Sequence, residues 1–67
     1  MHQYKTWYVF KISDSTRTEK WITDGKNEKE ARRNILKSLL YNTFHCPKID
    51  LLSVHKDYWD ARDWRNK

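Results

Sequence analysis

Residues 7–23, WYVFKISDSTRTEKWIT, carry the strongest structural signal in this 67-residue chain. Its two ends are dense in aromatic and β-branched residues, a composition that favours pleated strands. Between them lies Ser-Asp-Ser-Thr, residues 13–16, whose side chains bond nearby backbone groups in turns. The pattern therefore predicts a β-hairpin whose strands cover residues 4–12 and 16–23.

The alternation of side chains along this hairpin predicts two apolar faces. A turn centred on Asp14 and Ser15 places Tyr8 opposite Trp21, and an aromatic cross-strand pair of this kind stabilises a hairpin by about 0.2–1 kcal/mol. One face then carries Tyr8, Phe10, Ile12 and Trp21, and the other carries Trp7, Val9 and Ile22. A single helix covers only one face, so the other face needs a second cover or serves as a binding surface.

A helical pattern begins after Asp24-Gly25. Asn27 is suited to cap this helix, and Glu30 three residues later completes a capping-box arrangement. We expect the helix to fade near Tyr41. Apolar residues recur at helical spacing and form a stripe suited to lie on a sheet: Ala31, Ile35, Leu36, Leu39 and Leu40.

The last third of the chain predicts a strand and a short helical tail. Because apolar groups alternate onto both faces of IDLLSV, residues 49–54, we expect this strand to be central or covered on both sides. Asp57 is suited to cap one or two helical turns that follow. The aromatic residues of this tail are Tyr58, Trp59 and Trp64. The tail folds back over the open face of the sheet, joins a second copy in a homodimer, or offers an aromatic platform to a ligand.

Together these elements predict an α+β fold: a small ββαβ domain with a three-stranded, mostly antiparallel sheet, one amphipathic helix on one face and a short Trp-containing C-terminal helical tail. We expect residues 1–67 to form a single domain. The single cysteine, Cys46, excludes an intramolecular disulfide and fits a reducing compartment. Since the sequence contains neither a signal peptide nor an apolar run of about 18 residues, we expect a soluble cytoplasmic protein without a membrane partner.

Positive charge is concentrated in the middle of the chain. The net charge is +5, and residues 26–48 hold six basic and two acidic groups, a net +4. Lys29, Arg33 and Lys37 recur every four residues on the helix face away from the apolar stripe, and we call them the basic ridge. A nucleic acid would bind such a ridge through its phosphates, although an ordinary solvated helix face has the same pattern. The residues predicted to contact nucleic acid are Lys26, Lys29, Arg32, Arg33 and Lys37.

A second candidate site lies along the first predicted strand, where Lys5, Trp7 and Lys11 share one face. Lys20 of the second strand lies beside them. In proteins that bind single-stranded nucleic acid, aromatic rings stack on bases and ammonium groups meet phosphates. The same residues equally fit a half-covered core face whose lysines extend into solvent.

The stretch WYVFKISDSTRTEKW, followed by Asn-Glu-Lys-Glu-Ala at residues 27–31, resembles the small arm-site DNA-binding domains of phage-type integrases. Those domains have aromatic strands and then a helix that opens with a T-K-K-E-A-like stretch. The likeness covers less than half of the chain, and the family places three strands before the helix, whereas the third predicted strand follows it here. The short, lysine- and asparagine-rich chain also looks like an accessory protein of a phage or plasmid.

Catalytic and metal chemistry have little support in the sequence. Cys46 with His45 or His55 could form a nucleophilic pair, but the sequence offers no third orienting residue and no glycine-rich loop. His2, His45, Cys46 and His55 could supply four metal ligands by count, but their spacing does not match a structural zinc site. Asp57, Asp60 and Asp63 recur every three residues in the tail and could bind magnesium, but basic residues lie between and after them, which favours a salt-bridged helix face. We therefore expect a protein that is not an enzyme and has no metal or cofactor.

The composition and the ridge together predict a small basic binding protein, a monomer or homodimer, that binds nucleic acid through its basic helix face. The alternative is a small protein-binding module or inhibitor, encoded by a phage or plasmid, that acts on a host protein through exposed aromatic and arginine side chains.

Overall fold

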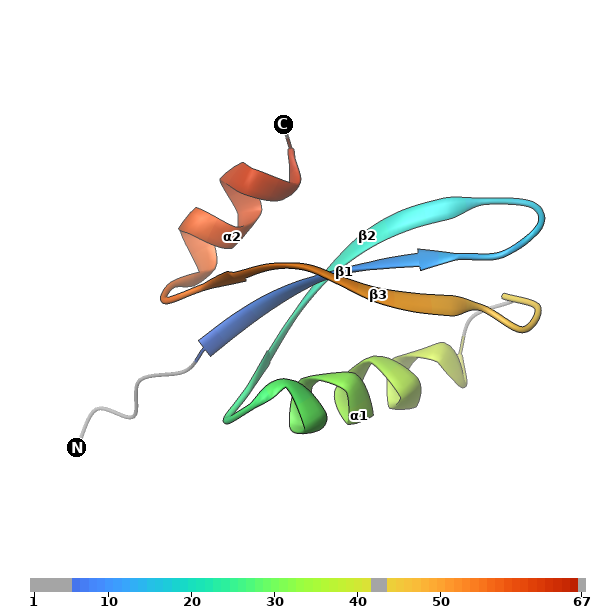
Figure 1. Ribbon diagram of the computed structural model, residues 1–67, viewed down its shortest axis with the longest axis horizontal. Helices are drawn as coiled ribbons and strands as arrows, with labels where there is room; N and C mark the ends of the chain where they lie inside the picture. Colours follow the sequence, from blue (N-terminus) through green and yellow to red (C-terminus); the bar gives the residue numbers. More distant parts are fainter. Residues whose placement is uncertain (1–5, 42–43, 67) are drawn as a thin grey trace.

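The computed structural model describes residues 6–41 and 44–66. Its elements are, in chain order, β1 (Thr6–Ser13), β2 (Thr18–Gly25), α1 (Glu28–Leu39), β3 (Lys48–His55) and α2 (Tyr58–Arg65). The strands form an antiparallel sheet in the order β2-β1-β3, and the two helices lie on opposite sides of it (Figure 1). The predicted α+β fold, with a three-stranded antiparallel sheet and a helical tail, is confirmed.

The hairpin between β1 and β2 has a longer turn than the sequence predicts. Tyr8 pairs with Thr23, whereas a turn centred on Asp14 and Ser15 would pair it with Trp21, so the predicted register is wrong by two residues. Because side chains alternate along a strand with a period of two, this shift leaves each side chain on its predicted face.

The carboxylate of Asp14 fixes this longer turn. Its Oδ1 atom accepts hydrogen bonds from the backbone N–H groups of Thr16, at 2.8 Å, and Arg17, at 2.9 Å. Its Oδ2 atom accepts from the backbone N–H of His45 at 3.0 Å, which ties the connection between α1 and β3 to the hairpin. These donors, the His45 N–H first among them, hold the pKa of Asp14 well below its usual range.

β3 is an edge strand, and β1 is the central strand, so the expectation that residues 49–54 form a central or doubly covered strand is wrong. The pairing with β1 is irregular, because Val9 pairs with Ser53 and Phe10 with Leu51, which leaves one extra residue in a β-bulge. Two apolar side chains remain exposed on this strand, Leu52 at 36% and Val54 at 53%.

The core lies between the central strand and α1. Phe10 and Ile12 of β1 are fully buried, and Ile35 of α1 packs with them. The helix begins as predicted at Asn27, whose side chain accepts a hydrogen bond from the backbone N–H of Glu30 at 2.9 Å.

The apolar stripe of α1 is narrower than the sequence predicts. Ala31 and Ile35 are buried and Leu39 packs against the core, but Leu36 and Leu40 are 55% and 81% exposed. Leu36 follows Ile35 by one residue, a rotation of about 100° around the helix axis. A helix that contacts a narrow sheet therefore buries one line of side chains and turns the next line toward solvent.

The connection from β2 to α1 is tight. Gly25 is buried, and a Cβ atom at this position would lie 2.9 Å from the backbone nitrogen of Ala31 and 3.2 Å from the backbone oxygen of Asn27. β2 extends through Gly25, so the strand does not end before this glycine as the sequence suggests.

α2 packs against the second face of the sheet, which agrees with the first interpretation of the tail. Asp57 caps the helix as predicted. Ala61 is fully buried, and the rings of Trp64 and His55 lie with their centroids 6.1 Å apart. Trp59, in contrast, is 66% exposed. Neither of the helices that the structure describes is long and apolar enough to cross a membrane.

Candidate nucleic-acid interface

The basic ridge lies on the solvent side of α1. Lys29, Arg33 and Lys37 are all exposed, whereas Ile35 on the sheet side of the helix is buried. Residues four apart on a helix are separated by a rise of about 6 Å and a rotation of about 40°, so the three cations form a nearly straight line. Lys26, which precedes the helix cap, is also exposed. Four of the five predicted nucleic-acid-binding residues are therefore accessible to a ligand.

The fifth, Arg32, holds the helix to the sheet. Its Nε donates to Oε2 of Glu28 at 2.8 Å, and its Nη1 donates to the backbone oxygen of Ile49 on β3 at 3.1 Å. Its guanidinium carbon lies 5.4 Å from the centroid of the Phe10 ring. These contacts direct Nε and Nη1 of Arg32 toward Glu28 and β3, and the side chain is 39% exposed.

Among the residues that the structure describes, the charges of the ridge have no partners. Within the part of the chain that the structure describes, Lys29, Arg33 and Lys37 make no ion pair and no side-chain hydrogen bond. Glu28, which directly precedes Lys29, is paired with Arg32. Like charges four residues apart on a helix repel each other, and an anionic ligand relieves this repulsion.

Exposed apolar side chains adjoin the end of the ridge. Besides Leu36 and Leu40, Tyr41 is 89% exposed, and it and Leu40 are the most exposed large hydrophobic side chains among the described residues. Tyr41 is not among the site residues predicted from the sequence. The available signal is its spacing, because Tyr41 follows Lys37 by the same four residues that separate the members of the ridge.

The second predicted site, on the hairpin, lies beneath α2. Trp7 is half-buried and contacts the first residue of α2 edge to face, with ring centroids 5.2 Å apart. Lys11 is half-buried, and the Nζ atom of Lys20 lies 5.6 Å from the centroid of the Trp64 ring. Lys5 lies outside the described residues. This geometry favours the interpretation of Trp7 as part of a half-covered core face, because Tyr58 of α2 contacts its ring.

The outer face of α2 carries a cluster of aromatic and arginine side chains. Trp59 projects from it, Tyr58 contacts Trp59 edge to face at 5.6 Å between centroids, and the guanidinium carbon of Arg62 lies 5.5 Å from the Trp59 ring. Trp, Tyr and Arg are the residues most enriched at the energetic centres of protein interfaces. The exposed carboxylates of the same helix and its cap are those of Asp57, Asp60 and Asp63.

A hydrogen-bonded chain of three side chains joins β3 to α2. Nδ1 of His55 lies 2.7 Å from Oδ2 of Asp60, and its Nε2 lies 2.5 Å from Oγ of Ser53. This order of atoms is that of a Ser–His–Asp triad. Acyl transfer also needs donors aimed at the developing oxyanion and room for a substrate. The evident role of this chain of bonds is to anchor α2, because the buried His55 joins the two elements.

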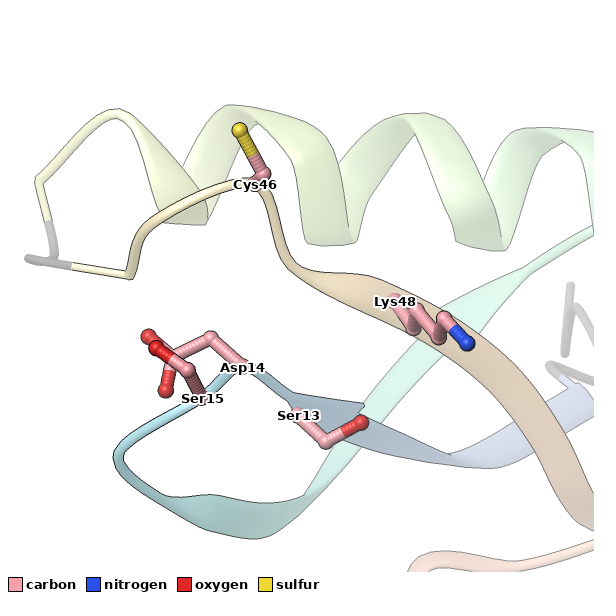
Figure 2. A pocket seen from close by; sticks show the side chains of 5 residues that line it. All are labelled: Ser13, Asp14, Ser15, Cys46 and Lys48. Carbon is pink, nitrogen blue, oxygen red and sulfur yellow. The ribbon is translucent and has the colours of Figure 1, made fainter.

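A depression of about 370 Å³ lies at the opposite end of the sheet from α2, where Asp14 meets the connection between α1 and β3. Figure 2 shows the thiol of Cys46 and the ammonium group of Lys48 pointing in different directions. The carboxylate of Asp14 is already satisfied by backbone donors. The residues that line the depression are Ser13, Asp14, Ser15, Cys46 and Lys48.

Among the described residues, no group of three or more His, Cys, Asp or Glu side chains is arranged to hold a metal ion. No protein-family profile, curated protein or solved structure matches the chain. The resemblance to the integrase arm-site domains gains no support from these comparisons. The order of elements also differs, because β3 follows α1.

Proposed function

We propose that this chain is a non-enzymatic nucleic-acid-binding protein of the cytoplasm that contacts phosphates through Lys29, Arg33 and Lys37, with Lys26 beside them. The observation that carries this proposal is the unpaired, exposed line of cations on α1. The other arginines on the α1 side, in contrast, are engaged by the fold, since Arg17 pairs with Glu19 and Arg32 with Glu28. The exposed, unpaired Cys46 fits a reducing compartment.

Charge reversal on the ridge tests the proposal. We expect Lys29→Glu combined with Arg33→Glu to abolish binding of labelled oligonucleotides in fluorescence anisotropy at low salt. The variant should keep the wild-type circular dichroism spectrum and melting temperature, because both side chains are exposed. In the wild type, the logarithm of the binding constant should fall with the logarithm of salt concentration, by about 0.7–0.9 per neutralised phosphate.

The matched control is Lys48→Glu combined with Lys56→Glu. Both residues are exposed and lie on or next to β3. Each double variant replaces two positive charges by two negative ones, which lowers the net charge from +5 to +1. Equal losses of affinity in the two variants would show that net charge, and not the ridge, determines binding, and would refute the proposed site.

A second candidate function is protein binding through the cluster of Tyr58, Trp59 and Arg62 on α2. The exposed Trp59 favours it, because a ring that is 66% exposed contributes little to the core. In a pull-down from host cytoplasm, a partner of this surface would be lost with Trp59→Ala and retained by the ridge variant. The reverse pattern would assign that partner to α1.

A further inference from the structure

We propose that the nucleic acid bound by α1 is single-stranded, with its phosphates along the ridge and a base stacked on Tyr41. This inference rests on the proposed function and narrows it to one class of ligand. Two features occur together on this side of the molecule. α1 carries the unpaired cations, and the most exposed aromatic ring among the described residues lies at the end of the same helix.

Tyr41 is held near the ridge by the way in which α1 ends. The cap residue Leu40 keeps helical backbone angles, φ −61° and ψ −24°. The backbone N–H of Tyr41 then donates to the backbone oxygen of Ser38 at 3.2 Å, which continues the turn beyond the helix. The phenol ring therefore projects into solvent about one turn beyond Lys37.

The apolar surface at this end of α1 distinguishes a single strand from a duplex. In a duplex the faces of the bases are stacked on one another, and a protein that follows the backbone meets mainly phosphate and sugar. In a single strand the faces of the bases are open, and they stack on aromatic rings and contact apolar side chains. Tyr41, Leu40 and Leu36 offer such a surface, at 89%, 81% and 55% exposure.

Local charge explains why the strand would use Tyr41 and not Trp59. Residues 26–41 hold five basic and two acidic groups, a net +3, whereas residues 57–66 hold two basic and three acidic groups, a net −1. A polyanion is attracted to the first segment and gains nothing at the second. Tyr41 follows the end of α1, whereas Trp59 lies on α2, and the two helices lie on opposite sides of the sheet (Figure 1).

The test compares labelled oligonucleotides of about 12 units, a length within the site sizes of single-strand binders. Oligothymidylate, oligouridylate and a mixed-sequence DNA duplex are titrated with the protein in fluorescence anisotropy. The two single strands separate DNA from RNA, which share the chemistry of phosphate and open base. We expect at least one of them to bind more tightly than the duplex.

Tyr41→Ala should weaken single-strand binding by about five- to a hundredfold, the range expected for the loss of one stacked base. Tyr41→Phe should bind like the wild type, because the ring remains. The slope of affinity against salt should not change in Tyr41→Ala, since no charge is lost. Trp59→Ala is the matched control on α2 and should leave oligonucleotide binding unchanged.

The outcomes separate this inference from the proposed function. If the ridge double variant loses binding but Tyr41→Ala does not, or if the duplex binds as tightly as both single strands, the single-strand assignment is wrong and the phosphate-binding function stands. If no oligonucleotide binds to the wild type at low salt, both are refuted.

Discussion

Asp14 shows how one side chain joins three backbone N–H groups. Its carboxylate accepts from Thr16 and Arg17 in the hairpin turn and from His45 in the connection to β3. The same donors lower its pKa in the folded state. A group with a depressed folded pKa stabilises the fold above its unfolded pKa, about 3.9 for Asp, and loses this contribution as the pH falls below that value.

We expect Asp14→Asn to lower the melting temperature at neutral pH. An amide has one acceptor oxygen, so the variant cannot serve both the turn and the N–H of His45. Thermal unfolding should be followed from neutral pH down to about pH 3. The wild type should lose more stability over this range than the variant, and parallel pH profiles would contradict the role given to the carboxylate.

Trp59 and Trp64 differ in their roles although both lie on α2. Trp64 is half-buried beside His55, whereas Trp59 is 66% exposed. Trp64→Ala should lower the free energy of unfolding by about 1–3 kcal/mol, less than the cost of truncating a fully buried ring. Trp59→Ala should change it by less than about 0.5 kcal/mol. Chemical denaturation measures both, and equal losses would place both rings in the core.

The short connection between β2 and α1 leads to a prediction for Gly25. Gly25→Ala should lower the free energy of unfolding by about 1–3 kcal/mol, because its Cβ would press on backbone atoms of Ala31 and Asn27 that no side-chain rotation can move. Urea denaturation of the variant provides the measurement. Wild-type stability would mean that the start of α1 shifts freely relative to β2.

The elements themselves were predictable from local patterns. The cap at Asn27, the spacing of the basic ridge and the alternation along β1 are properties of short stretches, and each has the expected structure. The register of the hairpin was not predictable, because it depends on which donors Asp14 finds. The exposure of Leu36 also escapes the pattern, because it depends on how much of α1 the sheet can cover.

The site was predictable only in part for the same reason. Periodicity places Lys29 and Arg33 on the outer face of α1, but it cannot show that Arg32 reaches the backbone oxygen of Ile49. That contact joins residues 17 positions apart and exists only once β3 is in place. The assignment of Trp7 to a core role, in the same way, required knowledge of where α2 lies.

At the scale of the whole molecule, the sheet separates two different surfaces. α1 carries unpaired cations on one side, and α2 carries the Trp59 cluster on the other (Figure 1). A ligand bound to one helix does not cover the other. The two candidate functions are therefore compatible, and both ligands can bind at the same time. The paired variants on α1 and α2 therefore report on independent surfaces.

The central position of β1 has a consequence for synthesis on the ribosome. β1 is translated first among the strands, but one of its two hydrogen-bonded neighbours, β3, comes after α1. Until β3 and α2 leave the exit tunnel, the free edge of β1 is unpaired and one face of the hairpin lacks the cover that α2 provides. Closure of such distant pairs is slow, and open edges of nascent sheets promote aggregation. The synthesis of β3 and α2 thus controls when the hairpin of β1 and β2 is protected from misassembly.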